Sequence, residues 1–147
     1  MNLEEKINAD LKSAMLAKDE PAVRGLRAIK QAILLAKTSG GGSIHADEEL
    51  KMLQKLVKQR KESVDIYIHQ NREDLAAPEK EEIAVIEKYL PAQMSEDEVR
   101  LELKNLIGSL GDVSAKDMGK IMGLASKHFA GKADNKLVSQ ILREILK

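Results

Sequence analysis

Apolar residues recur at three- and four-residue steps along almost the whole chain, which is the spacing of an amphipathic α-helix. At the amino terminus the stripe consists of Leu3, Ile7, Leu11 and Met15. Aromatic residues are nearly absent, with one Phe, two Tyr and no Trp, so the helices must pack through aliphatic side chains. We therefore predict an all-α protein.

A second helix is predicted to begin at Asp19 and Pro21. Aspartate accepts hydrogen bonds from the free amides of a first turn, and proline is tolerated early in a helix. The apolar face of this helix consists of Val23, Leu26, Ile29, Ile33 and Leu34. We expect the helix to end before residues 38–43, which contain three consecutive glycines and form a flexible connection. These glycines lack the Lys-Ser/Thr ending of a phosphate-binding loop.

A long third helix is predicted to be capped by Asp47. Its apolar residues follow a pattern close to a coiled-coil seam and are Leu50, Leu53, Val57, Val64 and Tyr67. Away from that seam lie Lys51, Lys55, Lys58 and Lys61. We interpret these lysines as a solvated outer face, with a nucleic-acid surface as the less favoured alternative.

A fourth helical segment is expected to begin at a cap on Asn71. Pro78 removes an amide that a continuous helix needs, so it should start or bend the segment. The apolar residues that follow are Ile83, Val85, Ile86 and Leu90.

The best domain boundary lies at Pro91, because proline disfavours helix at the preceding residue. A new start follows at Ser95 and Glu98, which form a capping box. We predict an N-terminal domain over residues 1–91 with a four-helix-like bundle. A C-terminal three-helix bundle is predicted over residues 92–147.

The C-terminal domain carries several further helix signals. Gly108 and Gly111 should end its first helix, and Ser114 with Asp117 repeats the capping-box pattern. Gly131 should terminate the second helix in the left-handed conformation, and Asp134 should cap the third. The same second helix contains two glycines, Gly119 and Gly123, which cost helix stability. We expect close approach of a neighbouring helix or of an RNA backbone to explain them.

No catalytic constellation is visible in the sequence. There is no cysteine, and His45, His69 and His128 stand outside any metal or protease motif. The acidic clusters fall at predicted helix starts, where negative charge favours the helix dipole. We predict no catalytic residue, no metal site and no cofactor. The first residues are acidic and no apolar run spans a bilayer, so we expect a cytoplasmic protein without membrane contact.

Charge is distributed unevenly although the formal net charge is zero. Acids predominate from Glu73 to Glu98, whereas bases predominate from Val113 onward, up to Lys147. The candidate nucleic-acid-binding residues are Lys116, Lys120, Lys132 and Lys136. They lie near two predicted helix starts, where amides and ammonium groups together can bind phosphates. The only aromatic platform for base stacking there is Phe129. The alternative is an ordinary lysine-rich surface.

Several segments together resemble a known family. They are residues 58–63, 71–75, 89–91, 95–98, 117–123 and 131–134. The set is similar to the tail domain that the B subunit of tRNA-dependent amidotransferases shares with the free-standing YqeY proteins. The resemblance covers almost the whole chain and implies a two-bundle helical fold whose tail binds tRNA or assists an aminoacyl-tRNA enzyme. Pro78 and Asn135 depart from the family pattern as we recognise it.

Three functions remain open. We expect a non-catalytic tRNA-binding or amidotransferase-associated module, because the resemblance and the tail lysines agree. The alternative is a protein-interaction adaptor that uses the long third helix. A carbon–nitrogen ligase with glutamine as amido-N-donor is less favoured, since this chain lacks the large cradle domain and the amidase subunit that carry out such chemistry in the amidotransferase. The oligomeric state stays open.

Overall fold

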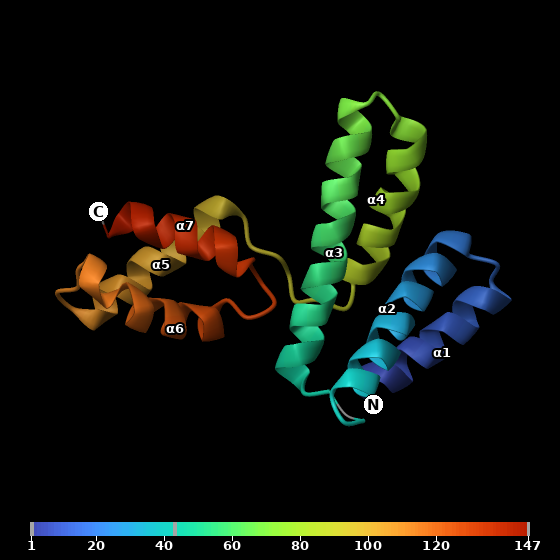
Figure 1. The fold of residues 1–147 in the computed structure, drawn as a ribbon, viewed down its shortest axis with the longest axis horizontal. Helices are drawn as coiled ribbons and strands as arrows, with labels where there is room; N and C mark the ends of the chain where they lie inside the picture. The colour runs from blue at the N-terminus through green and yellow to red at the C-terminus, as the bar shows by residue number, and fades with distance from the viewer. Residues whose placement is uncertain (1, 43, 147) are drawn as a thin grey trace. The chain divides into compact units, whose positions relative to one another are not determined.

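The computed structural model describes residues 2–42 and 44–146. Over these residues the chain forms α-helices and one short 3₁₀ turn, and no strand (Figure 1). Internal contacts divide it into two compact units, Met1–Leu90 (unit 1) and Pro91–Lys147 (unit 2). The prediction of an all-α protein made of helical bundles is therefore confirmed. Ser43 of the predicted connection and Lys147 of the basic tail lie outside the described residues.

Unit 1 contains two helical hairpins that pack together. The first hairpin is α1 (Leu3–Leu16) with α2 (Glu20–Ser39), and the second is α3 (Ala46–His69) with α4 (Glu73–Glu87). The predicted cap at Asp19 is present, since its carboxylate accepts a hydrogen bond from the amide of Ala22. The hairpins meet mainly where α2 contacts α4.

The end of α2 differs from the prediction, because the helix continues through Ser39. The hydroxyl groups of Thr38 and Ser39 donate to main-chain carbonyls one turn earlier in the helix, at 2.8 and 2.6 Å. These bonds satisfy polar side chains that would otherwise favour a loop. Gly41 and Gly42 then adopt φ angles of 83° and 98°, which end the helix.

Two further predicted boundaries are wrong by a few residues. His45 is the residue before α3 and makes no side-chain cap, while Asp47 lies inside the first turn. Asn71 does not cap α4 but takes a left-handed φ of 57° in the tight turn before it. Pro78 neither starts nor interrupts a helix, because α4 runs without a break from Glu73 to Glu87. Proline in the second turn removes one hydrogen bond and leaves the rest of the helix intact.

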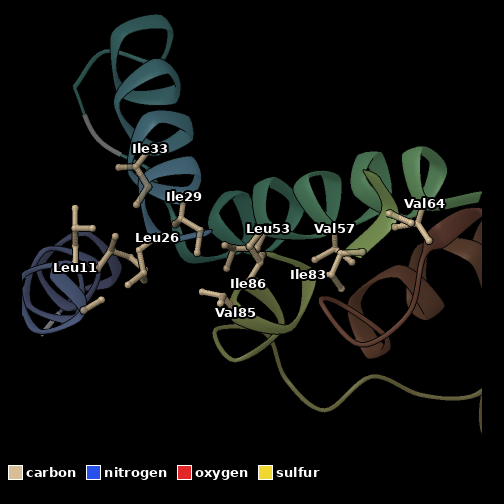
Figure 2. Close-up of a cluster of buried hydrophobic side chains, with 13 residues drawn as sticks. Leu11, Leu26, Ile29, Ile33, Leu53, Val57, Val64, Ile83, Val85 and Ile86 are labelled. Carbon is tan, nitrogen blue, oxygen red and sulfur yellow. The ribbon is translucent and has the colours of Figure 1, made fainter. Parts of the chain in front are cut away.

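The core of unit 1 is aliphatic and draws on all four helices. Figure 2 shows the buried side chains as a band that runs from Leu11 of α1 to Val64 of α3. Three residues assigned to apolar stripes from the sequence are not part of this core: Leu50, which is half-buried, and Met15 and Leu34, which are exposed. Met15 is 52% exposed and Leu34 is 49% exposed, because each lies at the edge of its helical stripe.

Helices α2 and α4 come close together at Gly25 of α2 and Val85 of α4. A Cβ atom on Gly25 would lie 2.8 Å from both the Cβ and the Cγ1 of Val85. Real Cβ atoms do not come this close, so only glycine lets α2 and α4 reach their observed separation.

Unit 2 comprises α5 (Glu96–Leu110), the 3₁₀ turn η1 (Ala115–Asp117), α6 (Met118–His128) and α7 (Asn135–Ile145). The capping box of Ser95 and Glu98 is confirmed, since both of its reciprocal hydrogen bonds form. Gly108 lies within α5 and does not end it, whereas Gly111 ends it with a φ of 82°. Helix α7 contacts both α5 and α6.

Unit 2 has its own core around Phe129. The fully enclosed side chains include Phe129, Leu103, Ile121, Ile141 and Leu142. Each of the three α-helices contributes to this cluster. Among the helices in the described part of the chain, none combines the length and apolar character that a bilayer crossing needs.

Candidate nucleic-acid interface

The four candidate lysines lie on three consecutive elements of unit 2. Lys116 belongs to η1, Lys120 to the first turn of α6, Lys132 to the turn after α6, and Lys136 to the first turn of α7. All four are exposed. Among the residues that the structure describes, none of these four side chains forms an ion pair or a hydrogen bond. We call this set the lysine surface.

The first pair of lysines is positioned by a capping box. Ser114 Oγ accepts from the amide of Lys116 at 3.4 Å, and Asp117 Oδ2 accepts from the amide of Ser114 at 2.9 Å. The predicted box is thus present, on a 3₁₀ turn that leads into α6. Because side-chain oxygens already occupy amides at this end, phosphate contact there must come mainly from the ammonium groups.

The second pair is positioned by the turn between α6 and α7. Gly131 takes a φ of 75°, as predicted for a left-handed residue, although α6 already ends at His128. Asp134 caps α7 by accepting from the amide of Lys136 at 3.2 Å. A carboxylate therefore also stands at the start of α7, in the place where a bound anion would otherwise lie.

The two pairs lie at opposite ends of α6. Lys120 is in its first turn, whereas Lys132 and Lys136 follow its last residue. The helix has 11 residues and is therefore about 16 Å long. That length corresponds to roughly five phosphates along one strand of a duplex. The arrangement thus suits an extended phosphate backbone and does not form a pocket for one phosphate.

The glycines of α6 have no neighbour that explains them. A Cβ atom on Gly119 or Gly123 would meet nothing within 4 Å, and both residues are exposed. The expectation of close packing against another helix of this chain is wrong. At a helical spacing of 100° per residue, both glycines share the outward face with Lys120 and Lys127. The lysine side chains there stand beside bare helix backbone.

Phe129 cannot act as a stacking platform, contrary to the expectation from the sequence. Its side chain is 0% exposed and lies in the core of unit 2. The ring centres of Phe129 and His128 are 4.9 Å apart, in a T-shaped arrangement. Because unit 2 has no other aromatic residue of the Phe, Tyr or Trp type, base stacking on such a ring is excluded for this surface.

Sequence reasoning missed the role of Gln93. Its Nε2 donates to the carbonyl of Gly131 at 2.7 Å and to that of Pro91 at 2.9 Å. Beside it, the amide of Met94 donates to the carbonyl of Lys132 at 3.0 Å. These bonds join two segments that are far apart in sequence. No local motif signals them; the only hint is that a tight turn leaves carbonyls that need donors.

Acidic residues of α5 are held by partners other than the lysine surface. Arg100 pairs with Glu96 at 3.3 Å and with Glu144 of α7 at 2.9 Å. The hydrogen bond that Arg100 donates to Glu144 raises the pKa of Arg100 above its usual range. Glu102 pairs with His128 at 2.6 Å. Glu96 and Glu102 of α5 are thus paired within unit 2.

The three histidines lie at or next to the ends of helices. His45 precedes α3, His69 Nδ1 contacts the carbonyl of Asp65 at 2.9 Å, and His128 contacts Glu102. Within residues 2–42 and 44–146, no group of three or more potential metal-ligating side chains gathers.

One small open cavity of about 190 Å³ lies in unit 1, where α1, α2 and α3 approach one another. Glu4 and Lys37 on its wall form an ion pair of 2.7 Å. Burial raises the pKa of Glu49, which also lines the cavity. The cavity is remote in sequence from the four candidate lysines.

The fold and this surface define a class of small, all-helical protein with an aliphatic N-terminal bundle and a lysine-bearing three-helix unit. Residues 4–146 match the family described as Yqey-like protein. The chain belongs to this YqeY-like family.

The chain is similar to several proteins named "Altered inheritance of mitochondria protein 41, mitochondrial". The relative from Pyrenophora tritici-repentis is 29% identical over 96% of this chain and 79% of its own length. The Saccharomyces cerevisiae relative is 34% identical over 71% of this chain and 58% of its own. The Clavispora lusitaniae relative is 32% identical over 82% of this chain and 70% of its own length. The chain thus spans only part of each relative.

The expectation of a cytoplasmic protein is contradicted by these relatives, whose names place them in mitochondria. The expectation rested on an acidic amino-terminal segment and on the lack of a long apolar run. Neither property specifies a compartment, because each excludes only one kind of sorting signal.

Proposed function

We propose that this chain is a non-catalytic module that binds the phosphate backbone of tRNA through its lysine surface. The proposal extends to association with a tRNA-dependent amidotransferase or another aminoacyl-tRNA enzyme, as the resemblance of the tail implies. The observation that carries it is that Lys116, Lys120, Lys132 and Lys136 are exposed at the two ends of α6, and that their side chains have no partner within residues 2–42 and 44–146.

Binding of this kind reads the shape of RNA and not its base sequence. Spaced ammonium groups contact phosphates of any sequence, and their binding energy comes largely from the release of counterions. Phe129 is buried and so contributes no stacking. Recognition of a folded RNA such as tRNA then depends on how its backbone curves past α6.

The test is a titration of labelled tRNA with the full chain at several salt concentrations. Replacing the four lysines of the lysine surface by Ala should weaken binding and flatten the salt dependence by roughly one ion per lost contact. The control replaces four other exposed lysines, Lys12, Lys51, Lys55 and Lys61. It removes equal charge from unit 1. Equal losses in the two variants, or no binding by the parent at low salt, would overturn the proposal.

The adaptor function has its own support in unit 1. Leu16 and Leu35 are 78% and 70% exposed, and Ile66 and Ile68 are exposed near the end of the third helix. Isolated exposed apolar residues are common on proteins, so they favour this function only weakly. A chain that binds no tRNA but retains one specific protein partner after mutation of the lysine surface would establish the adaptor.

A carbon–nitrogen ligase activity is the least favoured candidate. Such catalysis needs a positioned nucleophile or phosphate clamp. The purified chain is expected to form no amide on charged tRNA with glutamine and ATP. Turnover that survives removal of contaminating amidotransferase, and that follows the chain through purification, would require a catalytic function.

A further inference from the structure

The segment that enters unit 2, residues 91–94, is fastened to the turn that carries Lys132. One amide nitrogen, Gln93 Nε2, donates to the carbonyls of both Pro91 and Gly131. Next to it, the Met94 amide donates to the carbonyl of Lys132. The extended segment thus supplies donors to two consecutive carbonyls of the turn. We call residues 91–94 the entry segment.

The turn, residues 129–134, is also held by hydrogen bonds of its own backbone. Its inner side is anchored by Phe129, whose carbonyl accepts from the amides of Lys132 and Ala133 at 2.9 and 3.2 Å. Gly131 is buried and has a left-handed φ of 75°. The Lys132 side chain is exposed, while its carbonyl accepts the hydrogen bond from Met94 of the entry segment.

We propose that Gln93 is a positioning residue for the lysine surface. By fastening the entry segment to the Gly131 carbonyl, it holds Lys132 in the direction in which that lysine contacts phosphate. This inference rests on the proposed function. It adds that the contribution of Lys132 depends on the entry segment, whereas that of Lys120, in the first turn of α6, does not.

A double-mutant cycle separates these two contributions. Gln93→Met keeps a similar side-chain volume and removes the amide donor. It leaves the net charge of the protein, and so its electrostatic attraction for tRNA, unchanged. Gln140→Met is the matched control, because Gln140 is exposed on α7 and has no partner among the described residues. Each is combined with Lys132→Ala and with Lys120→Ala in the full chain, and tRNA binding is measured at one fixed low salt concentration.

In the parent and in Gln140→Met, Lys132→Ala should weaken tRNA binding by about three- to tenfold, as expected for one lost phosphate contact. In Gln93→Met the same substitution should change binding by less than about twofold, because Lys132 is no longer held in place. Lys120→Ala should have the same effect in every background. Exchange of the Met94 amide with solvent, measured without RNA, should accelerate in Gln93→Met and stay unchanged in Gln140→Met.

The inference is overturned if Lys132→Ala costs the same factor in Gln93→Met as in the parent, or if Met94 exchange does not change. Equal weakening of the Lys120 and Lys132 contributions would also overturn it, since that result indicates general destabilisation of unit 2. If the parent protein binds no tRNA at low salt, both the proposed function and this inference are wrong. This result is obtained before any variant is measured, so it is distinguishable from failure of the inference alone.

Discussion

The hydroxyl of Tyr89 donates a hydrogen bond to Asp10 Oδ2 at 2.5 Å, although 79 residues separate them in sequence. Lys6 Nζ stands 5.4 Å from the centre of the same ring. Tyr89 follows the end of α4, while Asp10 and Lys6 lie on α1. The pair therefore joins the first helix of unit 1 to its last.

Removing this bond should lower stability in a pH-dependent way. Tyr89→Phe is expected to reduce the free energy of unfolding by about 1–2 kcal/mol at neutral pH. Burial first, and then the hydrogen bond to Asp10, raises the pKa of Tyr89 above its usual value. Because the folded-state pKa is raised, the contribution is complete below the unfolded-state value of about 10 and is lost as pH rises above it.

Denaturant unfolding checks this prediction. The parent and the variant are compared at neutral pH and at a pH above about 10. The difference in stability between the two proteins should shrink at alkaline pH. A constant difference across this range would show that the Tyr89 hydroxyl does not contribute through its proton.

Gly25→Ala should destabilise unit 1 because the new Cβ would lie 2.8 Å from two atoms of Val85. Overpacking of this kind costs about 1–3 kcal/mol, partly offset by the roughly 1 kcal/mol that alanine gains over glycine in a helix. Denaturant unfolding measures the net loss. The double variant Gly25→Ala with Val85→Ala removes the opposing atoms of Val85. Its loss of stability should therefore be smaller than the sum of the losses in the two single variants. Strict additivity would contradict the proposed contact.

Gly119→Ala and Gly123→Ala should each stabilise unit 2 by up to about 1 kcal/mol. Both positions are helical and open, so the added methyl group displaces nothing. Gly111→Ala is the contrasting variant, because a φ of 82° strains any residue with a Cβ. The thermal unfolding temperature should therefore rise for the first two variants and fall for Gly111→Ala. A loss of stability at Gly119 would reveal a neighbour that the open surface does not show.

A fragment comprising residues 91–147 should fold alone with cooperative helical unfolding, since its caps and core are self-contained. Shortening it to residues 95–147 removes the donors of Gln93 and Met94 to the α6–α7 turn. We expect the shorter fragment to lose about 1–3 kcal/mol. Circular dichroism on heating compares the two. Equal stability would mean that the entry segment contributes nothing to unit 2, and absence of any transition would refute independent folding.

Much of the fold could be predicted from local signals. Ser95 with Glu98, Ser114 with Asp117, and the caps at Asp19 and Asp134 all form as expected, because each depends on atoms within four residues. The errors arose where competing local effects are similar in size. Thr38 and Ser39 continue a helix by bonding back to its carbonyls, and Pro78 is accommodated within α4.

The packing could not be predicted from local pattern. No local sequence pattern predicts that Gly25 contacts Val85 or that Gln93 bonds to Gly131. Phe129 was named as a base-stacking platform because it is the only aromatic residue of the tail, yet its side chain is fully buried in the core of unit 2. The exposure of the four candidate lysines is observed; their contact with RNA stays a prediction.

The hydrogen bonds of Gln93 also bear on how unit 2 responds to tension. Pro91 is its first residue, and the hydrogen bonds of Gln93 and Met94 are the first contacts that a pull along the chain from Leu90 would load. Such a pull would peel these few bonds from the Gly131–Lys132 turn one at a time, while the helical core around Phe129 resists as a whole. We therefore expect mechanical load applied through the boundary between the units to reach the lysine-bearing turn before it reaches any helix of unit 2.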